Sequence, residues 1–299
     1  RGWTLEYYKD GKSASVAVGK SKRTGTLWLS INGKVDASTG RDMPTQILSG
    51  QLPVEIYKGQ ENPREDIRTL VVGLASGVTA AETRKAGAKE LQVLEIEGAV
   101  VEAAALFQEH NNNILQDPQT QIITKDARAF LAQEVHLFDV IISEPSNPWL
   151  TGISNLFTVE YWTLTRGRLH KNGVFCQWVQ LYSMPTEGFR SLIKSFLSVY
   201  PNAWLFETIP GSDVLLIAAP TLPKGLPLKP LLGPKELEAL SKGAQHNTDD
   251  MPWIEFEAPK WVNRPTGKKN KDLFYLYNAL RKNIWWYDKS YCYRFIYCA

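Results

Sequence analysis

The chain has 299 residues, of which 43% are hydrophobic, 22% charged and 11% aromatic. This composition is typical of a globular protein and excludes a disordered or collagen-like chain. With 34 Lys and Arg against 31 Asp and Glu, the net charge is +3, which is too balanced to predict a nucleic-acid partner or binding to a membrane surface. The three cysteines have no CxxC spacing, so we expect no disulfide framework, no metal site and a reducing, cytoplasmic location.

Targeting signals are missing from the sequence as given. No apolar run reaches the ~18 residues of a membrane span, and no signal peptide opens the chain. The chain begins at Arg1 rather than Met, and we therefore expect it to be part of a longer protein.

Residues 1–60 are predicted to form a small N-terminal β domain. Short runs such as Thr26–Ile31 alternate apolar and polar side chains beside the turn signal Asn32-Gly33. The segment from Met43 to Tyr57 is less strand-like, and its second interpretation is a helix that leads into the next domain.

Residues 61–220 predict an α/β domain with a doubly wound parallel sheet, because strand-like and helix-like segments alternate. Residues 221–299 form a C-terminal extension with a Pro-rich start. Its aromatic tail, Trp285–Tyr297, is expected to pack on the body or on a second subunit rather than at a membrane. The predicted strands are Arg68–Val72, Leu91–Ile96, Gln121–Thr124, Phe138–Ser143, Gly173–Trp178 and an edge strand at Val214–Ala218.

The ends of these strands carry the candidate binding residues, since ligands of doubly wound sheets lie at the carboxyl ends of strands. Gly73–Gly77 is a small-residue loop that lets backbone approach a ligand. Glu95 follows the second strand, 22 residues beyond Gly73, a spacing suited to an acid that binds ribose hydroxyls. Alone, Glu95 and Asp126 have simpler explanations as helix-capping or turn residues. Together these features predict a nucleoside site, and the missing GxGxxG and P-loop motifs favour an adenosyl ligand over NAD or ATP.

Several motifs resemble those of the spermidine synthase (polyamine aminopropyltransferase) family over residues 15–220. That family has a strand reading DVII-S/T-D-S-S/T-D-P, a helix reading LFT-x-x-F/Y-Y, a GGVF-x-Q strand and a VEID segment. A bacterial branch, often fused behind membrane-spanning segments, also carries a late N-T-D-D-x-P segment. The matching segments here are Asn32–Asp36, Leu94–Glu97, Phe138–Pro148, Leu156–Trp162, Asn172–Gln177 and Asn247–Phe256.

The resemblance implies a Rossmann-like, methyltransferase-type domain behind a small β domain. It implies transfer of an aminopropyl group from decarboxylated S-adenosylmethionine to an amine such as putrescine, without a metal, in a homodimer that is possibly joined to a membrane domain. Glu144 stands at the family's catalytic Asp. The adenosyl ligand is assigned to Gly73, Ser76, Gly77, Glu95, Asp126 and Ala127, and the acceptor side to Asn147, Gln177, Tyr182, Asp36 and Gln51.

Two acidic positions of the family are neutral in this chain. Ser76 replaces the Asp of the family's GGGDGG loop, and Asn147 replaces the second Asp of D-S-S/T-D-P, a loss of two negative charges at a site for cations. Asp249, Asp250 or Glu255 would compensate if the late segment folds over the cleft; otherwise that segment is a capping turn with a strand edge.

Three functions therefore stay open. The first is an aminopropyltransferase with an altered acceptor. The second is a methyltransferase, or another enzyme of adenosyl sulfonium compounds, that uses intact S-adenosylmethionine. The third is a non-catalytic nucleoside-binding module of a membrane fusion.

Overall fold

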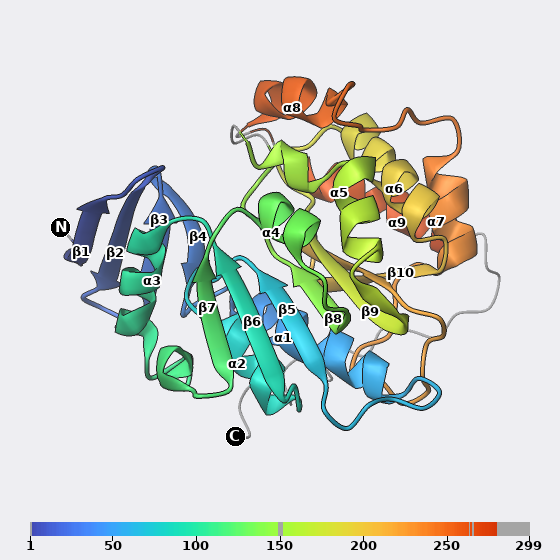
Figure 1. Ribbon diagram of the computed structural model, residues 1–299. Helices are drawn as coiled ribbons and strands as arrows, with labels where there is room; N and C mark the ends of the chain where they lie inside the picture. The colour runs from blue at the N-terminus through green and yellow to red at the C-terminus, as the bar shows by residue number, and fades with distance from the viewer. Residues whose placement is uncertain (1, 149–151, 263, 265, 280–299) are drawn as a thin grey trace.

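The computed structural model describes residues 2–148, 152–262, 264 and 266–279. Within these residues the chain forms a four-stranded antiparallel sheet and a seven-stranded sheet, side by side in Figure 1. The small sheet has the order β1-β2-β3-β4, and its alternating Val16, Val18 and Leu29 are buried on the face that packs against α3. Its strands are β1 (Trp3–Asp10), β2 (Ser15–Ser21), β3 (Leu27–Ile31) and β4 (Lys34–Ser38).

The large sheet has the order β10-β11-β9-β8-β5-β6-β7. Strands β5 to β9 are parallel to one another, whereas β11 runs antiparallel to both β9 and β10. Continuous apolar sequences such as that of β8 are buried on both faces, as parallel strands require. Its strands are β5 (Arg68–Val72), β6 (Glu90–Glu95), β7 (Thr120–Thr124), β8 (Phe138–Ser143), β9 (Leu169–Gln180), β10 (Ala203–Ile209) and β11 (Asp213–Ala218).

One strand prediction was wrong in position. The strand expected at Val214–Ala218 exists as β11, but it lies between β9 and β10 and not at the edge of the sheet. The sequence prediction omitted β10, which precedes β11 in a hairpin with Gly211 at a positive φ of 71°. Because the hairpin partner takes the outer position, β11 is held inside the sheet.

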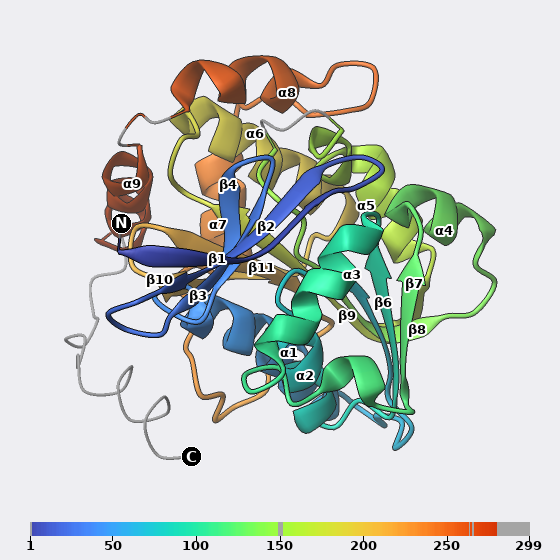
Figure 2. The same ribbon diagram turned by 90° about the vertical axis from the view of Figure 1, so that its left-hand side faces the viewer.

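Helices cover both faces of the large sheet (Figures 1 and 2). Helices α1 and α2 pack on one face, and α4, α5 and α6 pack on the other. Met43–Tyr57 is thus helical, as the second interpretation predicted. The helices are α1 (Met43–Lys58), α2 (Val78–Lys85), α3 (Gly98–Ala104), α4 (Ala127–Gln133), α5 (Val159–Arg166), α6 (Thr186–Val199), α7 (Pro234–Ser241), α8 (Trp253–Glu257) and α9 (Gly267–Ala279).

The two sheets are joined by the carboxylate of Glu97. Its Oε2 accepts hydrogen bonds from Ser13 N at 2.7 Å, Ser13 Oγ at 2.8 Å and Ala14 N at 3.1 Å, all in the turn between β1 and β2. Burial acts to raise the pKa of Glu97, but the hydrogen bonds from Ser13 and Ala99 outweigh it and lower the pKa to about 2. The hairpin is therefore anchored to the start of α3 by a charged group.

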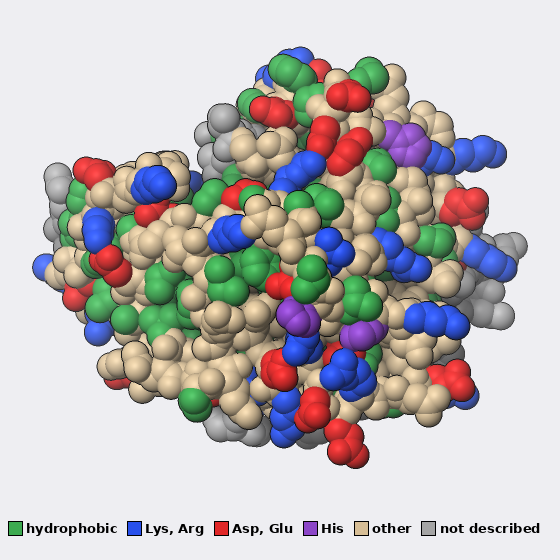
Figure 3. Space-filling view, viewed as in Figure 1, with side chains coloured by type: hydrophobic (Ala, Val, Ile, Leu, Met, Phe, Trp, Pro, Cys, Tyr) green, Lys and Arg blue, Asp and Glu red, His purple; other side chains and the backbone are tan. Residues whose placement is uncertain are grey.

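The surface agrees with the balanced charge of the sequence. In Figure 3 acidic and basic side chains are interspersed over the visible face rather than gathered by sign. No helix among the described residues combines the length and apolarity needed to cross a membrane. The aromatic tail Trp285–Tyr297 lies outside the described residues.

Candidate active site

The loop between β5 and α2 is forced into close contact with the loop after β8. Gly73 has a positive φ of 98°, and a Cβ on it would lie 2.5 Å from the carbonyl oxygen of Glu144. Gly77, at a φ of 81°, starts α2. Glycine is required at Gly73 both by its conformation and by the lack of space. The carboxyl ends of β5 and β8 thus form one edge, as the sequence predicts.

Glu95, at the end of β6, supports this loop from below. Its buried carboxylate accepts hydrogen bonds from Leu74 N at 3.1 Å and from Glu97 N at 3.0 Å. Burial raises the pKa of Glu95, although these backbone N–H groups oppose the rise. The structure places Glu95 beside the glycine loop, and its role as a ribose ligand stays a prediction.

Asp126 and Ala127 open α4. The exposed carboxylate of Asp126 accepts a hydrogen bond from Ala129 N at 2.8 Å and so caps the helix. Ala127 is buried against the core. The capping explanation of Asp126 is therefore correct, and contact with an adenine ring stays a prediction.

Glu144 follows β8 and points toward α1 and α2. Its Oε2 lies 2.5 Å from Thr79 Oγ1, and its Oε1 lies 3.4 Å from Ser49 Oγ. Burial raises its pKa to about 8, and the negative charges of Asp213 and Asp42 add to this rise. A carboxyl group with such a pKa is suited to exchange a proton near neutral pH.

Ser76 connects the glycine loop to α1. Its hydroxyl donates to Gln46 Oε1 at 2.5 Å, and Gln46 Nε2 donates to Asp42 Oδ2 at 2.9 Å. Gln46 was not among the predicted residues. The predicted acceptor residue Gln51 instead donates a hydrogen bond to Glu82 on α2.

The predicted acceptor residues Asp36 and Asn147 meet at the loop after β8. Asp36 forms an ion pair with Lys34 at 2.6 Å and accepts a hydrogen bond from Ser146. Asn147 is fully buried and donates to Tyr182 Oη at 3.4 Å. Burial raises the pKa of Tyr182 to about 12, partly offset by the Asn147 bond.

Gln177, also predicted on the acceptor side, is fully buried with its amide used internally. It accepts from Trp162 Nε1 at 3.1 Å and donates to the Ser143 carbonyl at 3.3 Å. Gln177 thus fixes the strand ends beside the site, and contact with an acceptor stays a prediction.

The negative charge missing from positions 76 and 147 is supplied by two acids that sequence reasoning did not include. Asp213 starts β11 and accepts hydrogen bonds from Thr45 Oγ1 at 3.1 Å and Ser212 Oγ at 3.4 Å. Burial raises its pKa to about 6, and nearby Asp42 adds to the rise. The only sequence signal was an acid directly after the Gly211 turn at a strand start.

The late segment does not contribute its acids to this cluster. Asp249 pairs with Arg128 of α4, Asp250 is exposed, and Glu255 accepts a hydrogen bond from Ser154 at 3.0 Å. Asn247 is buried and donates to the Phe157 carbonyl at 2.8 Å, which fastens the segment to the start of α5. The expectation that Asp249 or Asp250 replaces the missing charges is not met by these contacts.

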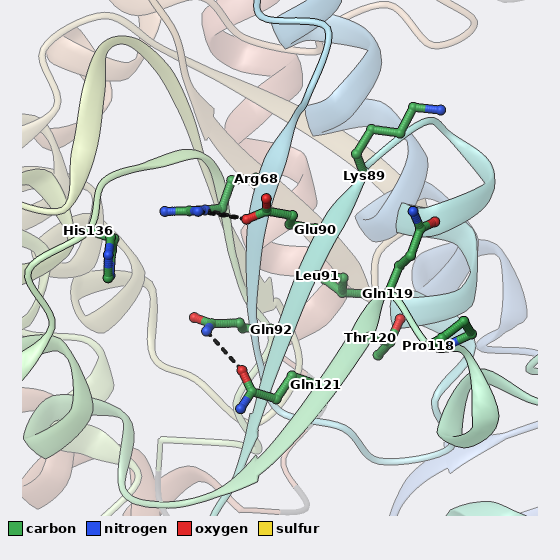
Figure 4. Close-up of a pocket in the computed structure, with 10 residues that line it drawn as sticks. All are labelled: Arg68, Lys89, Glu90, Leu91, Gln92, Pro118, Gln119, Thr120, Gln121 and His136. Atoms are coloured by element: carbon green, nitrogen blue, oxygen red, sulfur yellow. Dashed lines mark hydrogen bonds and ion pairs between the residues drawn. The ribbon is translucent and has the colours of Figure 1, made fainter.

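A cavity of about 420 Å³ lies at the opposite ends of the strands (Figure 4). It is lined by Arg68, Glu90 and Thr120, which begin β5, β6 and β7, and Arg68 pairs with Glu90 at 2.7 Å. This cavity is separate from the candidate site. In the part of the chain that the structure describes, no three His, Cys, Asp or Glu side chains are grouped to hold a metal ion.

Curated relatives carry names of one activity. The chain is 25% identical over 218 residues to a polyamine aminopropyltransferase of Thermotoga petrophila, covering 69% of each chain. It is 29% identical over 196 residues to a polyamine aminopropyltransferase of Synechococcus sp., covering 62% of this chain and 60% of that protein.

A solved structure of spermidine synthase in complex with the transition-state analogue AdoDATO superposes with a TM-score of 0.60. The match covers 88% of this chain and 87% of that one at 17% identity, which establishes a shared fold. The predicted fold class, an α/β domain behind a small β domain, is confirmed. The family model for the spermine/spermidine synthase domain matches residues 56–210, which include the glycine loop, Glu95 and Glu144. The chain therefore belongs to the spermine/spermidine synthase family, a family of transferases.

Proposed function

We propose that this chain transfers the aminopropyl group of decarboxylated S-adenosylmethionine to an amine and releases methylthioadenosine. One observation carries the proposal: Glu144 lies beside the glycine loop, is bonded to Thr79 and Ser49, and has a pKa raised to about 8. The names of the relatives and the bound analogue of the solved spermidine synthase support the same chemistry.

The reaction requires the acceptor nitrogen in its neutral form. An acceptor ammonium gives a proton to the Glu144 carboxylate, and its lone pair attacks the propyl carbon attached to the sulfonium. The carbon–sulfur bond breaks, sulfur keeps the electron pair, and methylthioadenosine leaves uncharged. Glu144 and the loops that hold both reactants thus supply proton transfer and positioning.

The remaining residues bind the two reactants. Gly73–Gly77 admits the adenosyl group, Glu95 binds the ribose and Asp126 lies toward the adenine. Asn147 and Tyr182 border the amine, where Asp213 and Asp42 provide negative charge in place of the family's missing acids. A homodimer, a cytoplasmic location and an attached membrane domain stay predictions.

Product analysis by mass spectrometry tests the proposal. The protein is incubated with decarboxylated S-adenosylmethionine and a panel of diamines and polyamines, and in parallel with intact S-adenosylmethionine. We expect methylthioadenosine together with an aminopropylated amine. Turnover of intact S-adenosylmethionine alone would establish the methyltransferase alternative, and binding of either nucleoside without turnover would establish the non-catalytic one.

A further inference from the structure

Asp213 and Gln180 lie directly opposite each other in the antiparallel pair of β11 and β9. Side chains at directly opposed positions project from the same face of a sheet, with Cβ atoms about 5 Å apart. Asp213 bonds to Thr45 of α1, so this face is the one that α1 covers. Gln180 therefore points toward the same space as Asp213, at the carboxyl end of β9.

Gln180 is fully buried, yet both its amide nitrogen and its amide oxygen have no hydrogen-bond partner among the described residues. Buried side-chain amides normally have partners, because an unpaired polar group loses its hydration without compensation. The structure has seven such buried atoms, and four of them belong to Asp36, Asn147 and Gln180. Unused hydrogen-bonding groups are thus concentrated beside the acid cluster, which indicates a polar ligand.

The charges in this space favour a cation. Asp213 receives hydrogen bonds only from hydroxyl groups in its printed contacts, those of Thr45 and Ser212. Lys34, the cation that acts on Asp213, is already paired with Asp36 at 2.6 Å. Burial and the negative charge of Asp42 raise the pKa of Asp213 to about 6, a cost that a bound ammonium removes.

We infer that Asp213 and Gln180 bind the second, non-reacting ammonium of the acceptor, so that the acceptor is a diamine or a longer polyamine and not a monoamine. This inference rests on the proposed aminopropyl transfer, because it assigns the reacting amine to Glu144. The Asp213 carboxylate and the Gln180 amide oxygen accept hydrogen bonds from the ammonium. They determine specificity without taking part in bond breaking.

The test compares two acceptors that differ in one group, 1,4-diaminobutane and 1-aminobutane, with decarboxylated S-adenosylmethionine as donor. For Asp213→Asn we expect the KM of the diamine to rise roughly 10- to 100-fold, the loss of one charged hydrogen-bonding partner. We expect kcat with the diamine to change less than about threefold, and kcat/KM with the monoamine to stay unchanged within about twofold. Asp66→Asn removes the same charge from an exposed position and serves as the matched control.

Two Gln180 variants test the same site with opposite signs. Gln180→Leu keeps the size of the side chain and removes its acceptor, so the KM of the diamine is expected to rise about 10-fold. Gln180→Glu adds a negative charge, and the KM of the diamine is expected to fall. An unchanged diamine KM in the Asp213 and Gln180 variants, or equal losses with both amines, would overturn the inference. If Asp213→Asn does not fold, the two Gln180 variants decide the question.

Failure of the proposed function has a different signature. If the unmodified protein releases no methylthioadenosine with either amine, aminopropyl transfer fails. Calorimetric titration with 1,4-diaminobutane alone then decides the inference. Binding that Asp213→Asn weakens at least about 10-fold, and Asp66→Asn does not weaken, supports it; no binding, or equal binding to both variants, overturns it.

Discussion

Thr79 Oγ1 lies 2.5 Å from Glu144 Oε2, and this contact joins the first turn of α2 to the residue that follows β8. The hydroxyl is also 3.1 Å from the Gln46 carbonyl of α1. Glu144 is thus held between two helices on the α1 side of the sheet. Its side chain is positioned before any substrate binds, which is the condition for efficient proton transfer.

Glu144→Gln is expected to lower kcat for aminopropyl transfer by roughly 10²- to 10⁴-fold, because the amide cannot accept the proton of the acceptor. The change keeps the shape of the side chain, so binding of methylthioadenosine is expected to stay the same. Steady-state kinetics and calorimetry measure the two effects. Full turnover in the variant would remove Glu144 from the mechanism.

Thr79→Val is expected to shift the pH dependence of kcat/KM. The Thr79 hydrogen bond lowers the pKa of Glu144 against burial and against the charges of Asp213 and Asp42. Without it, the pKa of Glu144 rises above about 8, and the acidic limb moves to higher pH by roughly 1–2 units. Thr83→Val is the control, since Thr83 Oγ1 bonds at 2.8 Å to the Thr79 carbonyl within the same helix. Equal profiles for both variants would contradict the prediction.

The stability of the free protein is expected to fall as the pH rises. The pKa values of Glu144 and Asp213 are raised to about 8 and about 6 in the fold, so each favours the folded state while protonated. That contribution is present below about pH 4 and is lost by about pH 8. Glu144→Gln cannot ionise and escapes part of the loss.

Urea unfolding at pH 4.5 and pH 8.5 measures this effect. Relative to the unmodified protein, we expect the unfolding free energy of Glu144→Gln to gain on the order of 2 kcal/mol between the two pH values. A difference that does not change with pH would show that Glu144 ionises normally in the fold.

Glu97→Gln is expected to loosen the β1–β2 hairpin by roughly 1–3 kcal/mol at neutral pH, because three donors in the hairpin turn lose a charged acceptor. The folded pKa of about 2 lies below the usual value, so this stabilisation disappears as the pH falls toward 2. Hydrogen exchange at Ser13 and Ala14 reports the change. Glu102→Gln, which breaks an exposed pair with Lys9, is the control and is expected to have a smaller effect.

Ser76→Asp is expected to favour decarboxylated over intact S-adenosylmethionine. The added carboxylate attracts the aminopropyl ammonium, and it repels the carboxylate that only the intact compound carries. Competition binding of the two compounds to Ser76→Asp and to the unmodified protein gives the ratio of affinities. An unchanged ratio would place the sulfonium side chain away from Ser76.

The parallel part of the fold could be predicted from local sequence. Arg68–Val72 and Phe138–Ser143 are strands with the predicted bounds, because each is a continuous apolar run that burial on both faces requires. The predictions failed at the antiparallel edge. Ala203–Ile209 forms the outer strand, and its place depends on pairing with β11 and not on its own pattern.

The sequence by itself determined the family motifs, the glycine loop and the position of Glu144 at a strand end. Tertiary structure alone decided which acids accompany Glu144. Asp42 lies before α1 and Asp213 at the start of β11, while Asp249 was drawn to Arg128. The physical reason is that charges act through space: the pKa of Glu144 depends on carboxylates brought near by the hairpin and by α1, and the spacing of residues along the chain does not encode those distances.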